Sequence, residues 1–232
     1  LNAFLDYSYY AHEEELKNGY LTLYGGHRAG ICGRVVIENG KVKLLKDISS
    51  INLRCCQEYK GTSENLLPVL FDREGRLYNT LIVSPPKCGK TTLLRDLVRA
   101  LSHKGMNVSV CDERSEIAGM HGGLPSFDIG PNTDVMDACP KGDGMLMLLR
   151  SMAPDVVVTD EIGRREETEA VEALLSAGVK VITTLHGGNQ EDLKRSNLYP
   201  LIRKGVFGRI VFLTSVPRPC TVSHVLGGKG DA

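Results

Sequence analysis

One short segment constrains the fold of this 232-residue chain more than any other. Residues 79–83 read Asn-Thr-Leu-Ile-Val, which is typical of a buried strand, and a leucine-rich stretch typical of a helix begins at residue 93. The turn between them reads Ser84, Pro85, Pro86, Lys87, Cys88, Gly89, Lys90 and Thr91. A strand, a tight turn with Gly-Lys-Thr and a helix together form the pattern of a phosphate-binding loop. The sequence therefore predicts a site for a nucleoside triphosphate.

The chemistry of such a loop assigns a role to each part of it. Backbone N–H groups within the loop between Ser84 and Thr92, with the positive end of the following helix, would surround phosphate oxygens. Lys90 would place its charge on the β- and γ-phosphates, and the Thr91 hydroxyl would bind Mg²⁺. Ser84 stands where the motif has its first glycine, so the turn requires a negative φ at this residue. Cys88 is interpreted as a small filler.

Composition excludes several classes of protein. The chain is 42% hydrophobic and carries 28 basic and 28 acidic residues, so no overall positive field favours nucleic acid. It has no Trp and few aromatic residues, which disfavours a base-stacking surface. No apolar run approaches the length of a membrane span, no signal peptide is recognisable, and we expect the natural N-terminus to be missing because the chain begins at Leu1. Seven cysteines without a Cys-x-x-Cys pair favour a reducing cytosol over disulfides or zinc.

Two regions of different character divide the chain. In the first, β-rich runs at 20–23, 31–37, 42–45 and 51–55 surround Asn39-Gly40, a strong hairpin signal, so we predict a small α+β domain over residues 1–72. In the second, strands and helices alternate, and we predict an α/β domain with a mostly parallel sheet over residues 73–232. Its expected helices are 93–101, 145–152 and 166–177, and its further strands are 107–111, 156–159, 179–185, 209–214 and 221–226.

Acidic residues follow two of these strands, at the sheet edge where ligands bind in open α/β folds. Asp160 and Glu161 come directly after the strand at 156–159. Asp160 is suited to hold Mg²⁺ through water, and Glu161 to polarise the attacking water or share the metal. The strand at 107–111 leads to a second acidic group, from which we favour Glu116 for activating water.

Two further features have less specific signals. His186 follows the strand at 179–185, which we expect beside the Asp160 strand, and its position favours a contact with the γ-phosphate. Residues 119–144 contain six glycines and three prolines. Their acidic and cysteine side chains lack a known ligand spacing, so we interpret the stretch as a solvated loop.

With these motifs located, the chain resembles the secretion-ATPase superfamily of type II secretion, pilus-retraction and type IV secretion ATPases. Residues 149–170 resemble its Walker B region and following helix, 183–186 its His box and 112–116 its Asp box. Within the superfamily, the chain resembles the stage III sporulation protein AA family of endospore-forming bacteria, from Gly25 to Leu226.

That resemblance implies a RecA-like P-loop core that hydrolyses ATP with Mg²⁺ and assembles into a hexameric ring. It also implies a cytoplasmic motor, peripheral to the membrane on the mother-cell side of the channel to the forespore, with channel proteins as partners. Such motors use arginines of the N-terminal domain to contact phosphates, and Arg28, Arg34 and Arg54 are the candidates by position. Ser84 departs from the usual glycine, which puts loop geometry or turnover rate in question.

Two other classes of function stay open at this stage. A nucleic-acid-stimulated RecA-like ATPase would use the same core, although the neutral net charge and the scarcity of aromatic residues argue against it. A nucleotide-binding scaffold with little turnover would agree with the serine at position 84. A small-molecule kinase is disfavoured because no acceptor-binding signature is visible.

Overall fold

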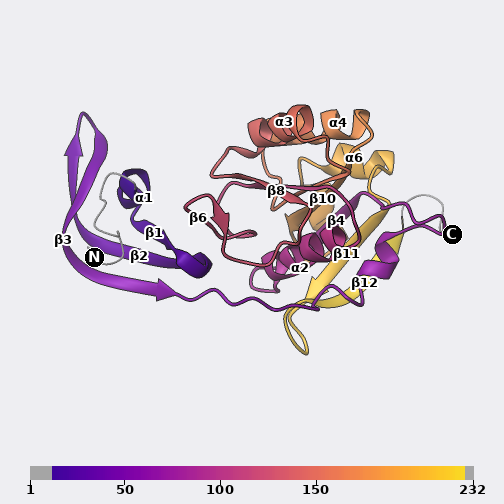
Figure 1. The fold of residues 1–232 in the computed structure, drawn as a ribbon, viewed down its shortest axis with the longest axis horizontal. Helices are drawn as coiled ribbons and strands as arrows, with labels where there is room; N and C mark the ends of the chain where they lie inside the picture. Colours follow the sequence, from indigo (N-terminus) through magenta and orange to yellow (C-terminus); the bar gives the residue numbers. More distant parts are fainter. Residues whose placement is uncertain (1–11, 228–232) are drawn as a thin grey trace. The chain divides into compact units, whose positions relative to one another are not determined.

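A computed structural model describes residues 12–227 and divides them into two compact units (Figure 1). The small unit comprises residues 12–58 and 119–127, and the large unit comprises 59–118 and 128–227. Residues 59–72 thus pack with the large unit. The predicted domains, residues 1–72 and 73–232, are regions expected to fold independently, and their boundaries stay a prediction.

The small unit is built around a three-stranded antiparallel sheet in the order β1-β2-β3, preceded by α1 (Glu13–Lys17). The strands are β1 (Tyr20–Leu23), β2 (His27–Glu38) and β3 (Lys41–Arg54). The β2–β3 turn has positive φ at Asn39 (52°) and Gly40 (74°), which confirms the predicted hairpin. The separate strand predicted at 51–55 is wrong, because Ile51 to Arg54 form the end of the single long β3.

A segment from the middle of the sequence belongs to this small unit. Residues 119–127 contain the two short strands β6 (Met120–His121) and β7 (Leu124–Pro125). The ring of Phe127 lies where a Cβ atom at Gly26 or Gly119 would clash with it, so both positions need glycine. The chain therefore passes between the two units three times.

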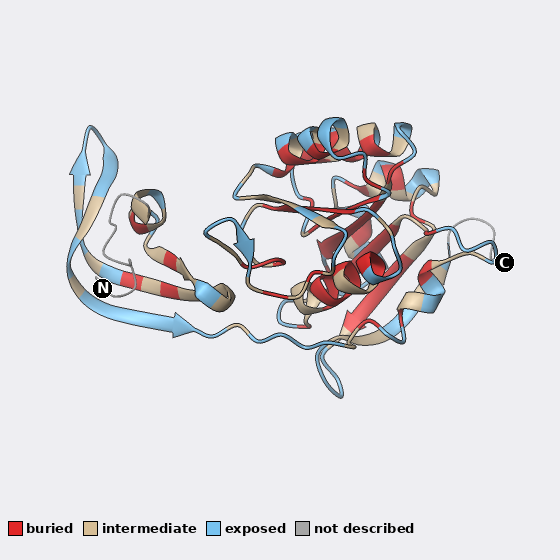
Figure 2. Cartoon of the chain, viewed as in Figure 1, coloured by how far each residue is buried: buried red, intermediate tan, exposed pale blue. Residues whose placement is uncertain are grey.

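The large unit contains a seven-stranded sheet in the order β12-β11-β4-β10-β9-β5-β8. Only the β11–β12 pair is antiparallel, so the prediction of a mostly parallel sheet is confirmed. Its strands are β4 (Thr80–Ser84), β5 (Val108–Asp112), β8 (Thr133–Asp137), β9 (Val156–Thr159), β10 (Lys180–His186), β11 (Arg209–Thr214) and β12 (Thr221–Gly227). Figure 2 shows the inner strands as mostly buried.

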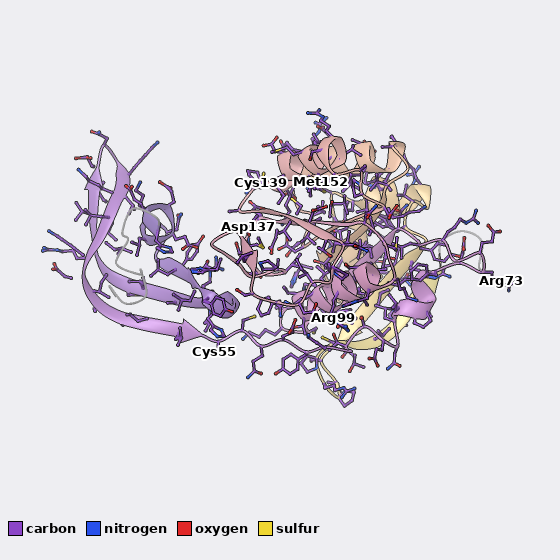
Figure 3. All side chains as sticks on the ribbon, in the orientation of Figure 1. Cys55, Arg73, Arg99, Asp137, Cys139 and Met152 are labelled. Atoms are coloured by element: carbon purple, nitrogen blue, oxygen red, sulfur yellow. The ribbon has the colours of Figure 1, made fainter. Side chains whose placement is uncertain are left out.

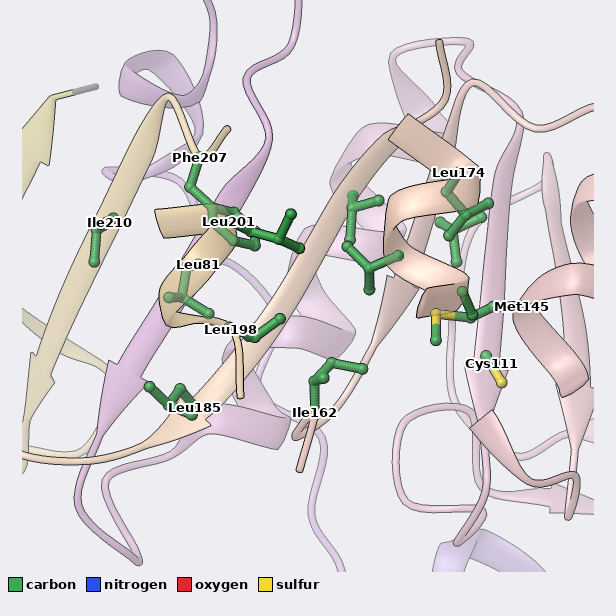
Figure 4. Close-up of a cluster of buried hydrophobic side chains, with 14 of the residues drawn as sticks. Leu81, Cys111, Met145, Ile162, Leu174, Leu185, Leu198, Leu201, Phe207 and Ile210 are labelled. Carbon is green, nitrogen blue, oxygen red and sulfur yellow. The ribbon is translucent and has the colours of Figure 1, made fainter. Parts of the chain in front are cut away.

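Helices cover both faces of this sheet, as parallel strands require. The helices α3 (Lys141–Ser151), α4 (Arg165–Ser176) and α6 (Tyr199–Lys204) pack on one face, where Leu81, Met145, Leu174 and Leu201 belong to one buried cluster (Figure 4). Figure 1 shows α2 (Lys90–His103) on the opposite side. Between β10 and α6 lies the short α5 (Gln190–Lys194).

The interpretation of residues 119–144 as a solvated loop is wrong for the second half of the stretch, where a strand of the main sheet and the start of a helix lie. Residues 133–137 form β8, which pairs with β5 at the edge of the main sheet. Residues from Lys141 onward begin α3, and Lys141 itself is buried. Asp137, labelled in Figure 3, ends β8, and Cys139, labelled in the same figure, lies between β8 and α3. In residues 12–227, no helix has the length and apolar content that crossing a membrane requires.

The packing of α3 leads to a first prediction. Leu148 is 1% exposed within the cluster of Figure 4, whereas its neighbour Met147 is 48% exposed. Leu148→Ala should lower the free energy of unfolding by about 2–5 kcal/mol, and Met147→Ala by less than about 1 kcal/mol. Urea denaturation of both variants measures this difference, and equal losses would contradict the orientation of α3.

Candidate nucleotide site

The predicted phosphate loop begins where β4 ends, in the middle of the large sheet. Ser84 is still part of β4, is buried, and pairs with His186 of β10. Left-handed backbone occurs further on, at Lys87 (φ 61°) and Gly89 (φ 86°). Serine therefore fits at the first position of the motif. Because Pro85 and Pro86 have no N–H, the donors of this loop come from residue 87 onward.

Lys90 is the first residue of α2 and turns back over the loop. Its Nζ donates to the main-chain oxygens of Ser84 (2.9 Å) and Pro85 (3.2 Å). Burial lowers the pKa of this lysine, while the attraction of Glu161 raises it. The ammonium group thus lies within the loop, close to the carboxylate that follows β9.

Cys220, in the turn before β12, closes one side of the loop. Its N–H donates to Cys88 O (2.8 Å) and its Sγ to Gly89 O (3.3 Å). A Cβ atom at Gly89 would overlap Cys220 Sγ. Gly89 is therefore required both for its positive φ and for this close approach.

A cavity of about 740 Å³ lies next to this side of the loop. Thr92 and Cys220 border it on the loop side, and Tyr59 and Asn65 are among its other lining residues. It thus offers an aromatic ring and polar side chains beside a candidate phosphate site, which is the composition of a small-molecule pocket. Sequence reasoning missed this cavity because its walls come from residues 59–66 and 218–222, far apart in the chain.

Asp160 and Glu161 follow β9, which lies beside β10 as predicted. Asp160 Oδ1 forms an ion pair with Lys141 Nζ at 2.6 Å, and the Asp160 main-chain oxygen accepts from Thr183 Oγ1 at 2.9 Å. Lys141 Nζ also donates to Glu161 O at 2.7 Å. Glu161 itself is exposed, so its carboxylate can meet a ligand or water.

The acidic stretch after β5 forms a turn around Asp112. This buried carboxylate accepts the N–H groups of Glu116, Ile117 and Ala118, each at 2.9 Å. Burial raises the pKa of Asp112 to about 6, and the hydrogen bonds from the three N–H groups oppose this increase. The guanidinium of Arg95, on α2, donates to the main-chain oxygens of residues 116 and 117. Asp112 and Arg95 therefore fix the backbone that carries Glu116.

The remaining predicted residues fall into two groups. His186 ends β10 at the level of Ser84 and is exposed, so it stands beside the loop. Arg28, Arg34 and Arg54 belong to the small unit. There Arg28 packs 4.1 Å from the centroid of the Tyr20 ring, and Arg34 pairs with Asp47 at 2.9 Å. A contact of these arginines with phosphate stays a prediction.

The family described as sporulation stage III, protein AA matches residues 1–232. The chain belongs to this family. Stage III sporulation protein AA of Bacillus subtilis (strain 168) is 46% identical over 237 residues, which covers 100% of this chain and 76% of that protein.

Two solved structures have a fold similar to that of this chain over most of its length. The Legionella pneumophila ATPase DotB superposes with a TM-score of 0.53 at 17% identity, over 80% of this chain and 52% of that one. The pilus retraction motor PilT, solved with bound ADP, superposes with a TM-score of 0.53 at 16% identity, over 88% of this chain and 61% of that one. At these identities the similarity shows the fold alone, an α/β fold shared with these two ATPases, which agrees with the predicted RecA-like core. The chain spans about half of DotB.

The side chains around the loop include oxygen ligands that are suited to magnesium. Thr91, Asp160 and Glu161 offer a hydroxyl and two carboxylates, and oxygen ligands are those that Mg²⁺ prefers. Magnesium in proteins usually keeps several waters and takes substrate phosphates among its ligands, and these three side chains fit an ion bound in that way. Among residues 12–227, no group of three or more His, Cys, Asp or Glu side chains could hold a metal ion.

The close approach of Gly89 to Cys220 leads to a second prediction. Gly105 also has a positive φ (87°), but no atom lies near its missing Cβ. Gly105→Ala should lower the free energy of unfolding by about 1–2 kcal/mol through the backbone alone. Gly89→Ala should lose a further 1–3 kcal/mol, by order of magnitude, from overpacking. Chemical denaturation measures both, and equal losses would contradict the contact with Cys220.

Proposed function

We propose that this sporulation stage III AA protein is a magnesium-dependent ATPase. The observation that carries the proposal is the convergence at one sheet edge of the loop after β4, the acids after β9 and the histidine that ends β10. Backbone donors, a lysine and paired carboxylates at this edge are the requirements of phosphoryl transfer from a nucleotide. The resemblance to secretion ATPases supports ATP as the nucleotide.

The nucleotide would extend from the loop into the neighbouring cavity. Its phosphates would accept from the N–H groups of residues 87–92, while Lys90 exchanges the Ser84 and Pro85 oxygens for phosphate oxygens. The base and ribose would occupy the cavity bordered by Thr92, with the ring of Tyr59 as a stacking surface. The volume of about 740 Å³ is in the range of ligand pockets.

Each residue then has a role in hydrolysis. Thr91 and Asp160 would hold magnesium, which neutralises charge on the phosphate oxygens when bound. Glu116 would activate the attacking water, and Glu161 would polarise it or share the metal. His186, beside Ser84, would contact the γ-phosphate. Lys90 would stabilise the charge that develops on the phosphates.

The family and the fold support a motor role for this chemistry. We infer that six copies form a ring in which Arg28, Arg34 or Arg54 reaches the phosphates. The ring would act in the cytoplasm at the mother-cell face of the membrane, against the cytoplasmic parts of channel proteins. It would drive assembly of, or transport through, the channel between mother cell and forespore.

Turnover and binding by matched variants test the ATPase. Lys90→Ala should abolish ATP binding in calorimetry, because the loop loses its cation. Glu161→Gln should bind ATP with affinity close to wild type and lower kcat by about 10²- to 10⁴-fold. The control is Lys104→Ala at the opposite end of α2, which should leave both quantities unchanged.

Three outcomes would contradict parts of this assignment. Undiminished affinity in Lys90→Ala would exclude the loop as the phosphate site. Wild-type turnover in Glu161→Gln would remove this residue from the mechanism. Tight ATP binding by wild type without turnover would instead establish the nucleotide-binding scaffold.

Oligomerisation tests the motor role. With ATP and Mg²⁺ at high protein concentration, light scattering should show more hexamer than without nucleotide. Lys90→Ala should give the same distribution with and without ATP, because it cannot bind the nucleotide that links subunits. Wild type that stays monomeric under these conditions would contradict the ring.

A further inference from the structure

No sequence motif assigns a role to Lys141, yet it is the one buried lysine within residues 12–227, at 5% exposed. Its Nζ lies 2.6 Å from Asp160 Oδ1 and 2.7 Å from Glu161 O, and 3.6 Å from Glu113 Oε2. A lysine is almost never this buried unless its charge is paired. These three oxygens come from the exits of two different strands, β9 and β5.

Local sequence explains how a lysine reaches this position. Lys141 opens α3, and Gly144 N–H donates to Pro140 O at 2.8 Å in the first turn. Gly144 faces β5 so closely that a Cβ atom would lie 2.6 Å from Cys111 Sγ. Cys111 Sγ also contacts Lys141 O at 3.8 Å. The missing side chain of Gly144 therefore allows the start of α3 to approach the carboxyl end of the sheet.

The geometry has a direct effect on Asp160. One carboxylate oxygen, Oδ1, is buried and lies 2.6 Å from the ammonium group, as an ion pair in which Oδ1 accepts no hydrogen bond of regular geometry, so it is Oδ2 that can turn toward a ligand at the sheet edge. The bond to Glu161 O fixes the backbone of the next residue as well. A single cation thus restrains the orientation of both acids that the proposed hydrolysis requires.

We propose that Lys141 is a positioning residue that acts through Asp160, so that this carboxylate presents Oδ2 to the magnesium site. The inference rests on the proposed ATPase function and adds a residue to it. Groups that orient a metal-binding residue typically contribute 10- to 100-fold to metal affinity or activity. A lysine with a purely structural role would instead affect stability without acting through Asp160.

A double-mutant cycle on kcat separates these two roles. The variants are Lys141→Met, Asp160→Asn and the double variant, with Lys204→Met as control, since Lys204 forms an exposed ion pair with Glu172 at 3.6 Å. Lys141→Met should lower kcat about 10- to 100-fold with KM for ATP within about threefold. In the Asp160→Asn background, the same change should lower kcat by less than about twofold, because its target is already removed. Lys204→Met should match wild type.

A second measurement does not depend on turnover. Mn²⁺ binding to the ADP complex, followed by electron paramagnetic resonance, should weaken about 10-fold in Lys141→Met and stay unchanged in Lys204→Met. Lys141→Arg, which keeps a cation, should recover part of both losses. If Lys141→Met does not fold, two measurements still test the positioning role. They are the kcat of Lys141→Arg and the comparison of the double variant with Asp160→Asn.

The outcomes that would overturn the inference are distinct from those against the ATPase. Wild-type kcat and Mn²⁺ affinity in Lys141→Met would exclude the positioning role, as would equal losses from this change in both backgrounds. If the wild type hydrolyses ATP, either result leaves the proposed ATPase function unaffected. A wild type without turnover would contradict the ATPase itself, and the Mn²⁺ measurement would still test Lys141.

Discussion

Two hydrogen-bond ladders hold β4 between β10 and β11, and their parallel direction determines where chemistry is possible in this molecule. Parallel strands place their carboxyl ends at one edge, so the loop after Ser84 and the residue His186 emerge side by side. The next ladder, between β10 and β9, adds Asp160 and Glu161 to the same edge. The candidate site is thus a consequence of sheet direction before any side chain is considered.

Buried polar groups then fix the loops at this edge. Asp112 and Arg95 hold the turn at residues 116–118, and Lys141 holds the turn at 160–161. Each of these groups loses hydration when it is buried, so its partners must replace that hydration. The arrangement favours rigidity of the acidic turns, which precise positioning of a nucleotide and its metal requires.

The sequence alone predicted those strands and site residues that are indicated by a pattern of neighbouring residues in the chain. Buried β-branched runs predicted β9, β10 and β11, and the ends of these strands predicted Asp160 and His186 as site residues. The sequence did not predict β8, which is an edge strand. Asp134 and Asp137 interrupt the alternation of apolar and polar residues that is typical of a half-buried strand. Lys141 was missed for a related reason. A lysine between proline and glycines is typical of a solvated turn, and only partners 19 and 28 residues away explain its burial.

The second of the three chain crossings has a consequence for the candidate site. Residues 119–127 belong to the small unit, but they begin directly after the turn that carries Glu116 and end shortly before β8. The turn itself is held within the large unit by Asp112 and Arg95. The backbone next to the candidate water-activating glutamate is thus the covalent boundary between the two units.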